Sequence, residues 1–147
     1  MQFGDLDPHD DRRRYGMMMI NGIKVTKAFN INDKQQEFTG QIFDGIKTVE
    51  TRERHTLDSL IGMTVAIVRT GKWKAIIVGT CRISGSVEYR TESEFVSAFR
   101  AHRVAIGSKF DFQHSKTGMK VGYILTDAVE LDRPIPCKSS GIVIRNI

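Results

Sequence analysis

The 147-residue sequence has few of the features that mark secreted, metal-binding or membrane proteins. Its two cysteines, Cys81 and Cys137, lie far apart and form no CxxC pair. This excludes a disulfide framework and is typical of reduced thiols in a cytoplasmic protein. The four histidines are scattered without metal-ligand spacing. No apolar run approaches the ~20 residues that a membrane helix needs. We therefore expect a cytoplasmic protein with no membrane segment, no metal and no cofactor.

Blocks of like charge are also missing. The chain has 22 Lys and Arg residues against 17 Asp and Glu residues, a formal net charge of +5. No run of five or six like charges marks a nucleic-acid-binding tail. The mild positive excess nevertheless favours polyanionic partners such as nucleic acid. The length fits one domain with a core of its own. Residues 1–16 are polar and charged, so we expect a flexible arm there and a domain over residues 17–147.

Two main helices are predicted. The first spans residues 33–44, with Asp33 as its N-cap and Gly45 as the glycine that ends it. The second runs from residue 91 to about residue 101, because Thr91 and Glu94 have the spacing of a capping box. The phenylalanines that we expect in the core are Phe95, Phe99, Phe110 and Phe112.

Several short strands are indicated as well. Asn21-Gly22 between two apolar stretches is typical of a type I′ hairpin turn. Further strands are expected from Thr48 onward and at residues 63–69, 75–83, 110–112, 122–131 and 142–147. The elements show no β-α-β rhythm. This pattern favours an α+β fold built as a small mixed barrel over a parallel, doubly wound sheet.

The most informative stretch is residues 45–52, Gly-Ile-Lys-Thr-Val-Glu-Thr-Arg. Its β-branched residues favour a strand, in which alternate side chains share a face. Glu50 and Arg52 then lie about 6.6 Å apart along one face, close enough to meet or to hold one small polar ligand. Lys47 falls in the turn between Gly45 and the strand. The pattern therefore predicts a Lys-Glu-Arg cluster after the end of a helix.

Two interpretations of this cluster are open from the residues alone. Lys47, Glu50 and Arg52 can form a salt-bridge network that fixes the helix–strand junction, in which case the chain is a protein-interaction module. Alternatively, they can line a cleft, because a preformed Lys-Glu-Arg cluster suits a phosphate group or the edge of a base. Nothing in the sequence identifies a protein partner.

The pattern G-x-K-x-x-E-x-R resembles the signature of the ASCH family, a branch of the PUA-like β-barrels. The context agrees with it: an amphipathic helix before the pattern, a strand at residues 65–68 after it, and Arg133-Pro-Ile-Pro136 before the last strand. The resemblance covers roughly residues 20–147. It implies a PUA-like barrel whose cleft holds the Lys, the Glu and the Arg and binds RNA, a nucleotide or a nucleoside.

The family resembles a branch of small amidohydrolases that act on N(4)-acetylcytidine. These enzymes use a Lys, a Thr three residues after it and a distant Glu. Lys47 matches the Lys, but Glu50 stands where the catalytic Thr is expected. The distant Glu would be Glu88, Glu92 or Glu94. A hydrolase acting on a modified nucleoside or on RNA is therefore the alternative function. In it Lys47 would stabilise an oxyanion and Glu50 would activate water.

Three further residues are candidates for ligand binding. Arg54 extends the positive surface, unless it only belongs to a solvated loop. Trp73, between Lys72 and Lys74, can stack a base or cover the open end of a barrel. Tyr123 can line the cleft or belong to the core.

Overall fold

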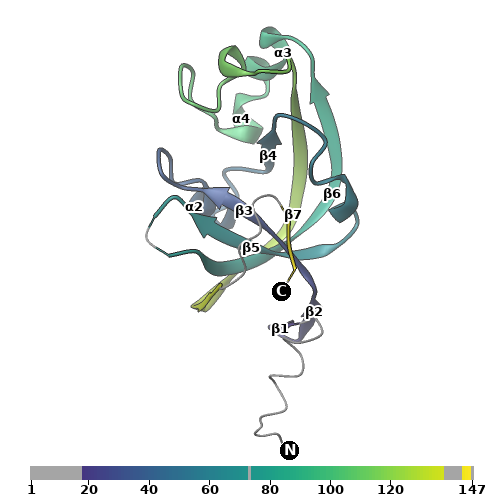
Figure 1. The fold of residues 1–147 in the computed structure, drawn as a ribbon, viewed down its shortest axis with the longest axis vertical. Helices are drawn as coiled ribbons and strands as arrows, with labels where there is room; N and C mark the ends of the chain where they lie inside the picture. Colours follow the sequence, from purple (N-terminus) through teal and green to yellow (C-terminus); the bar gives the residue numbers. More distant parts are fainter. Residues whose placement is uncertain (1–17, 73, 138–143, 147) are drawn as a thin grey trace, which may run out of the picture.

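The computed structural model describes residues 18–72, 74–137 and the backbone of 144–146, and it shows an α+β fold (Figure 1). The strands are β1 (Met18–Ile20), β2 (Ile23–Val25), β3 (Lys27–Asn32), β4 (Val49–Arg52), β5 (Thr64–Thr70), β6 (Ile76–Tyr89), β7 (Lys120–Pro136) and β8 (Ile144–Asn146). The α-helices of the described residues are α2 (Phe38–Phe43), α3 (Glu92–Ser97) and α4 (Phe99–His102). Two 3-10 turns are η1 (Asp58–Leu60) and η2 (Phe112–His114). The expected arm at residues 1–16 lies outside the described residues.

The strands form a mixed six-stranded sheet in the order β4-β7-β6-β5-β3-β8 and a separate hairpin, β1–β2. β3 pairs with β5 in parallel, and the other neighbouring strands are antiparallel. The α+β class is therefore confirmed. Among the described residues, β4 and β8 are the edges of the sheet and no pairing joins them, so strand pairing gives an open sheet and not a closed barrel.

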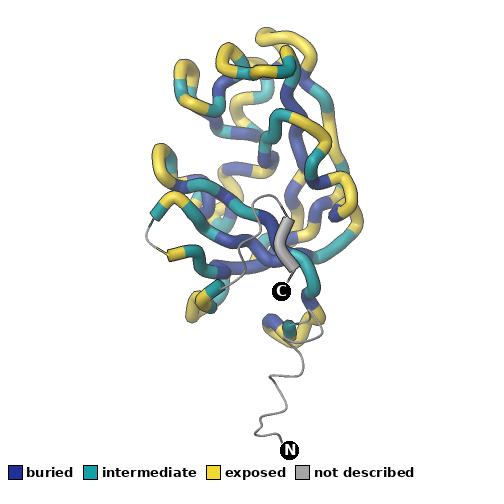
Figure 2. The backbone as a smooth tube through the Cα atoms, in the orientation of Figure 1, coloured by how far each residue is buried: buried dark blue, intermediate teal, exposed yellow. Residues whose placement is uncertain are grey.

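The two longest strands, β6 and β7, form a ribbon along the molecule, with α3 and α4 near one end and β1–β2 near the other (Figure 1). Their register shifts at three places, and such bulges bend a ribbon and increase its twist. Buried residues follow the middle of this ribbon and its neighbouring strands, whereas the loops are exposed (Figure 2). β4 pairs with β7 on the free side of the ribbon, which places the motif strand at a sheet edge.

The N-terminal hairpin is confirmed. Ile20 pairs with Ile23, and Asn21 and Gly22 have φ angles of 49° and 78°. Positive φ at both central residues is what a type I′ turn requires.

The first predicted helix is shorter than expected, since α2 begins at Phe38 and not at residue 33. Asp33 still serves the helix, because its carboxylate accepts hydrogen bonds from the backbone N–H of Thr39, at 3.1 Å, and from the Thr39 hydroxyl. The cap thus acts across an intervening loop. Gly45, with φ of 76°, ends the helix as predicted.

The second predicted helix is divided at Ala98 into α3 and α4. Its start is correct: Thr91 accepts a hydrogen bond from the Glu94 N–H at 3.1 Å. Because of the division, Phe99 is 37% exposed, and its expected place in the core is wrong. His102 is buried instead and stacks on Phe95, with ring centroids 4.0 Å apart.

The strand expected at residues 110–112 is also wrong. These residues belong to the segment 103–119, which we call the α4–β7 loop. Its fold depends on Asp111, whose carboxylate accepts from the N–H groups of Gly107 at 2.6 Å and Phe112 at 2.7 Å. Such local side-chain bonds to the backbone compete with strand pairing.

Candidate functional site

The position of Lys47 is set by the end of α2. The N–H groups of Ile46 and Lys47 both donate to the Gln41 carbonyl, at 2.8 and 3.0 Å, which closes the helix after its terminal glycine. The next residue, Thr48, donates its N–H to the Ala101 carbonyl of α4 at 2.9 Å. Lys47 is therefore fixed between the ends of two helices before β4 begins.

The ammonium group of Lys47 is buried beneath this junction. Lys47 is 1% exposed, and its Nζ donates to the His102 carbonyl at 2.6 Å. The same atom lies 3.4 Å from Glu50 Oε1 and 4.4 Å from the centroid of the Phe38 ring. Burial lowers the pKa of Lys47, and the neighbouring Glu50 carboxylate opposes this effect.

Glu50 links Lys47 to Arg52. Its Oε2 lies 3.3 Å from Arg52 Nη2, and that nitrogen also donates to the Asn30 carbonyl on β3. The two side chains share a face of β4 and meet, as the strand period predicts. Arg52 Nε is buried and has no hydrogen-bond partner among the described residues. We call Lys47, Glu50 and Arg52 the cavity cluster.

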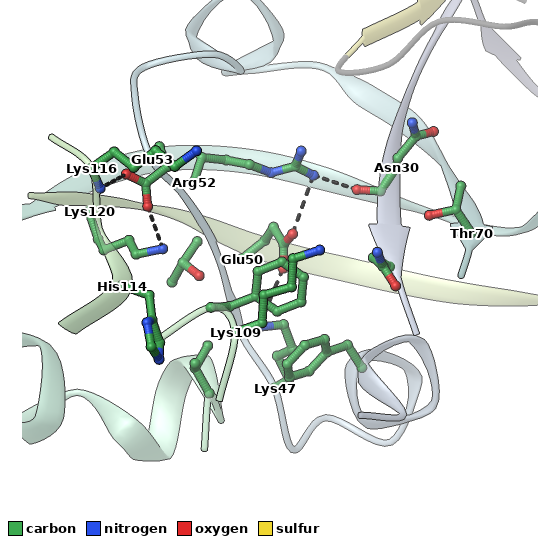
Figure 3. Close-up of a pocket in the computed structure, with 15 residues that line it drawn as sticks. Asn30, Lys47, Glu50, Arg52, Glu53, Thr70, Lys109, His114, Lys116 and Lys120 are labelled. Atoms are coloured by element: carbon green, nitrogen blue, oxygen red, sulfur yellow. Dashed lines mark hydrogen bonds and ion pairs between the residues drawn. The ribbon is translucent and has the colours of Figure 1, made fainter. Parts of the chain in front are cut away.

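The cavity cluster lies in a cavity of about 690 Å³ (Figure 3). β3, β4, the start of β7 and the α4–β7 loop contribute most of its wall. The lining residues are Asn30, Asn32, Phe38, Lys47, Glu50, Thr51, Arg52, Glu53, Thr70, Val104, Lys109, Phe110, His114, Lys116 and Lys120. This size falls within the range of small-molecule and cofactor sites.

A second ion pair crosses the cavity wall. Lys120 is buried, and its Nζ lies 2.7 Å from Glu53 Oε2. Glu53 Oε1 also accepts from the Ser115 hydroxyl at 3.1 Å and the Lys116 N–H at 3.0 Å. Partial burial raises the pKa of Glu53, but the hydrogen bond from Lys120 and those from the loop outweigh it, so the pKa is lowered overall.

Sequence reasoning missed Glu53 and Lys120. Glu53 follows the motif directly, but its partner is 67 residues further along and no local pattern joins them. The pairing depends on the antiparallel register, which places Arg52 opposite Val121. The only available signal was a carboxylate directly after the motif.

The backbone carbonyl of His102 holds the ammonium group of Lys47, and the His102 ring is itself fixed by hydrogen bonds. Its ring Nδ1 accepts from the Val104 N–H at 2.9 Å, and its Nε2 lies 2.6 Å from the Phe95 carbonyl. This arrangement requires a neutral ring with the proton on Nε2. Burial lowers the pKa of His102, which agrees with that state.

The electrostatic balance of the cavity is positive. Five lysine and arginine side chains line it, against the two carboxylates Glu50 and Glu53, a formal excess of three positive charges from these residue types. Lys109 and Lys116 are exposed, and within the described part of the chain neither ammonium group has an ion pair. The cavity is therefore suited to an anionic ligand.

Two of the other predicted binding residues, Arg54 and Tyr123, do not line the cavity. Arg54 is exposed and does not line it. Tyr123 is buried in the core, where its hydroxyl donates to Asp58 Oδ1 at 2.5 Å and accepts from the Leu57 N–H at 3.1 Å. Trp73 lies outside the described residues.

The glutamates considered as a distant catalytic partner are also elsewhere. None of Glu88, Glu92 and Glu94 lines the cavity, and its second carboxylate is Glu53. Cys81 does not line it either, and burial raises the pKa of the Cys81 thiol to about 12.

The described residues contain no group of three or more His, Cys, Asp or Glu side chains placed to hold a metal ion. None of their helices is long and apolar enough to cross a membrane.

Comparison of the sequence with protein-family models gave no match, and neither did comparison with curated proteins. Solved structures do match. A serine-to-alanine variant of an ASCH protein from Zymomonas mobilis has a TM-score of 0.65 and 19% identity, over 82% of this chain and 87% of that chain. The ASCH structure from Zymomonas mobilis has a TM-score of 0.58 and 20% identity, over 75% and 72% of the two chains.

A tyrosine-to-phenylalanine variant from the same organism gives a TM-score of 0.56 and 21% identity, over 75% of this chain and 74% of that one. The described part of the chain thus has an α+β fold with a charged cavity beside an edge strand. More specifically, it has the ASCH fold, in agreement with the resemblance of its Lys-Glu-Arg motif.

Proposed function

We propose that this chain is a PUA-like, ASCH-type module that binds RNA or a nucleotide in the cavity beside β4. The observation that carries the proposal is the cavity itself, about 690 Å³ in volume, with an excess of three positive charges along its lining. Phosphate groups are matched by such a surface. The motif residues Lys47, Glu50 and Arg52 are among the residues that line it.

The groups of the cavity suit different parts of a nucleotide. Arg52 lines the cavity, and the exposed part of its guanidinium group can pair with a phosphate oxygen or a base acceptor. Glu50 has each oxygen beside one cation, and a carboxylate has about four lone-pair sites, so it can still accept from a base amino group. Phe110 is half-buried in the wall and offers a ring for stacking.

The cavity cluster is held in place before any ligand arrives. Its ion pairs and the bonds to the His102 and Asn30 carbonyls fix the rotamers of Lys47 and Arg52. A preorganised site loses less conformational entropy on binding. This favours a binding role over a purely structural one, although the same bonds also join the helix ends to β4.

Binding is tested with Arg52→Gln and its matched control Arg54→Gln. Arg52 lines the cavity, whereas Arg54 is exposed two residues further along. Isothermal titration with short single-stranded RNA and with nucleoside monophosphates should give an affinity that falls as salt rises. Arg52→Gln should weaken binding by roughly tenfold, the usual effect of losing a charge-assisted hydrogen bond, and Arg54→Gln should not change it.

Circular dichroism shows whether both variants keep the fold. The proposal is wrong if none of these ligands binds the wild type at low salt, or if the two arginine variants weaken binding equally.

The second candidate is a hydrolase acting on a modified nucleoside or on RNA. It is favoured by one observation: Lys47, whose pKa is lowered by burial, lies 3.4 Å from Glu50 in the same cavity. Glu50 would take a proton from an attacking water. Lys47 has one N–H beyond those directed at His102 and Glu50, and this N–H would stabilise the oxyanion.

Turnover distinguishes this candidate from a binding module. The wild type, Lys47→Met and Glu50→Gln are incubated with N(4)-acetylcytidine and other modified nucleosides, and the products are measured by mass spectrometry. A hydrolase should release product in the wild type and lose this activity in both variants. Equal turnover in all three proteins would exclude a role for the two residues.

A further inference from the structure

The end of α4 is held by side chains and backbone of the segment 36–48, which contains α2. Three successive carbonyl groups accept hydrogen bonds from this segment, those of Ala101, His102 and Arg103. The donors are the Thr48 N–H at 2.9 Å, Lys47 Nζ at 2.6 Å and Gln36 Nε2 at 3.0 Å. The last carbonyl groups of a helix have no partner within the helix. These donors therefore fix the point at which α4 leads into the α4–β7 loop.

Gln36 holds this point with both ends of its carboxamide. Its Nε2 donates to the Arg103 carbonyl, and its Oε1 accepts from the Ala105 N–H at 3.1 Å. Gln36 is half-buried and lies 67 residues before Arg103 in the sequence. Because it bonds to backbone groups on both sides of Val104, it sets the direction of the chain there. Val104 belongs to the cavity wall.

The backbone of Arg103 depends on such support. Its φ is 63°, in the left-handed region that is more costly for arginine than for glycine. The Arg103 side chain does not line the cavity, and its Cζ lies 4.8 Å from the centroid of the Phe99 ring. A residue keeps a costly backbone conformation where the surrounding structure imposes it. The two bonds from Gln36 supply part of that constraint.

The position of Lys47 depends on the same turn of the chain. Its ammonium group donates to the His102 carbonyl, directly before the carbonyl that Gln36 holds. The ammonium group also lies over the Phe38 ring, and Phe38 contacts Phe110 of the α4–β7 loop, with ring centroids 6.5 Å apart. The end of α4 and the loop after it therefore help to enclose Lys47, which is 1% exposed.

We propose that Gln36 is a latch and a positioning residue for Lys47. Its two hydrogen bonds hold the start of the α4–β7 loop closed over the buried ammonium group, and breaking both admits water to Lys47. Hydrogen bonds of a neutral carboxamide are weaker than those of a charged group, so the latch opens without unfolding of the sheet. The inference goes beyond the proposed function, because it does not depend on which ligand the cavity takes.

The latch is tested with Gln36→Met, which keeps a similar length and lacks the amide donor and acceptor. The matched control is Gln35→Met, since Gln35 is the exposed neighbour. Hydrogen exchange of the Ala105 amide, measured by NMR, should be at least roughly tenfold faster in Gln36→Met, the factor expected for two neutral hydrogen bonds. Gln36→Glu keeps an acceptor but cannot donate to the Arg103 carbonyl, so its rate should be intermediate. The control should exchange at the wild-type rate.

Acylation of Lys47 measures the effect on the cavity. The proteins are treated briefly with acetic anhydride, and the label at Lys47 is quantified by mass spectrometry relative to the exposed Lys24. Lys47 should react several-fold faster in Gln36→Met than in the wild type or in Gln35→Met. Amide exchange in the buried strand β5 reports whether the whole protein has been loosened.

The outcomes separate a latch from a residue that only adds to stability. Faster exchange confined to the start of the α4–β7 loop, with faster labelling of Lys47, supports the inference. It is wrong if exchange rises as much in β5 as at Ala105, or if either measurement on Gln36→Met equals that on Gln35→Met. No nucleotide is used, so a failure of nucleotide binding leaves this inference in place.

Discussion

Two groups of charged side chains are each joined by ion pairs and differ in their burial. In the cavity cluster, the side chains of Lys47, Glu50 and Arg52 are 0%, 12% and 17% exposed. A second group, which we call the outer network, joins His55, Asp58, Glu88 and Arg90, with side chains 38%, 50%, 32% and 70% exposed. The first group lines a cavity, and the second does not.

The difference shows how similar ion pairs can have different consequences. In the outer network His55 Nδ1 lies 3.1 Å from Asp58 Oδ1 and His55 Nε2 lies 2.5 Å from Glu88 Oε2, but water competes for these groups. In the cavity cluster the side chains are largely buried, so each charge depends more strongly on its protein partner. We therefore expect the cavity cluster to be sensitive to the loss of one member and the outer network to tolerate it.

The largest expected effect is that of Glu50→Ala, which leaves Lys47 and Arg52 without their shared carboxylate. Breaking a buried ion pair costs about 3 kcal/mol or more, because an uncompensated charge remains buried. The free energy of unfolding should fall by about that amount in urea titrations. The matched change in the outer network, Glu88→Ala, should give a much smaller loss, because water replaces part of the lost contacts. A similar result for the two variants would show that burial does not separate these groups.

A smaller effect is expected for Tyr123→Phe. Tyr123 pairs with Glu50 across the β4–β7 ladder, but its hydroxyl bonds to Asp58, so it connects the two groups. Without that hydroxyl the Leu57 N–H loses its acceptor. The free energy of unfolding should fall by roughly 1 kcal/mol.

The same variant tests the position of Tyr123 outside the cavity. RNA affinity, measured by titration under the conditions used for Arg52→Gln, should stay at the wild-type value. A loss of RNA affinity without a loss of stability would show that Tyr123 contributes to ligand binding.

The parts of the fold that sequence reasoning predicted depend on neighbouring residues. Asn21-Gly22 set the hairpin, Gly45 ended α2, and the two-residue period placed Glu50 and Arg52 together. In each case the physical cause lies within a few positions of its effect. The resemblance to ASCH proteins then agreed with the observed fold.

The parts that were missed depend on contacts between distant segments. The His102 carbonyl reaches Lys47 only because α4 ends beside the segment that joins α2 to β4. Lys120 reaches Glu53 only through the register of β7. The strand expected at 110–112 failed for a local reason, since the side-chain bonds of Asp111 favour a turn over strand pairing.

The smallest expected effect is a pH dependence that belongs to the outer network and is removed by His55→Gln. Hydrogen bonds to Glu88 and then to Asp58 raise the pKa of His55 above its ordinary value of 6.5. The folded protein then holds this proton more tightly than the unfolded chain. The stabilisation is complete below pH 6.5 and is lost as pH rises through the folded-state pKa.

The carboxylates of Glu88 and Asp58 determine the lower end of the pH range in which the outer network stabilises the folded protein. The pKa of Glu88 is lowered by its hydrogen bond from His55, and that of Asp58 by its bond from Tyr123 and then by His55. Their stabilisation is present above the ordinary values of 4.5 and 3.8 and is lost as pH falls through the lowered values. The difference in melting temperature between wild type and His55→Gln should therefore be largest between pH 4.5 and 6.5.

Lys47 should behave in the opposite way, which sharpens the contrast between the two groups. Because burial lowers its pKa, the unfolded chain binds this proton more tightly, and the contribution of Lys47 to stability rises as pH increases towards 10.5.

Thermal unfolding of the wild type and His55→Gln from pH 4 to pH 9 measures the His55 contribution. A melting-temperature difference that does not vary with pH would mean that His55 is not held as a cation between Glu88 and Asp58.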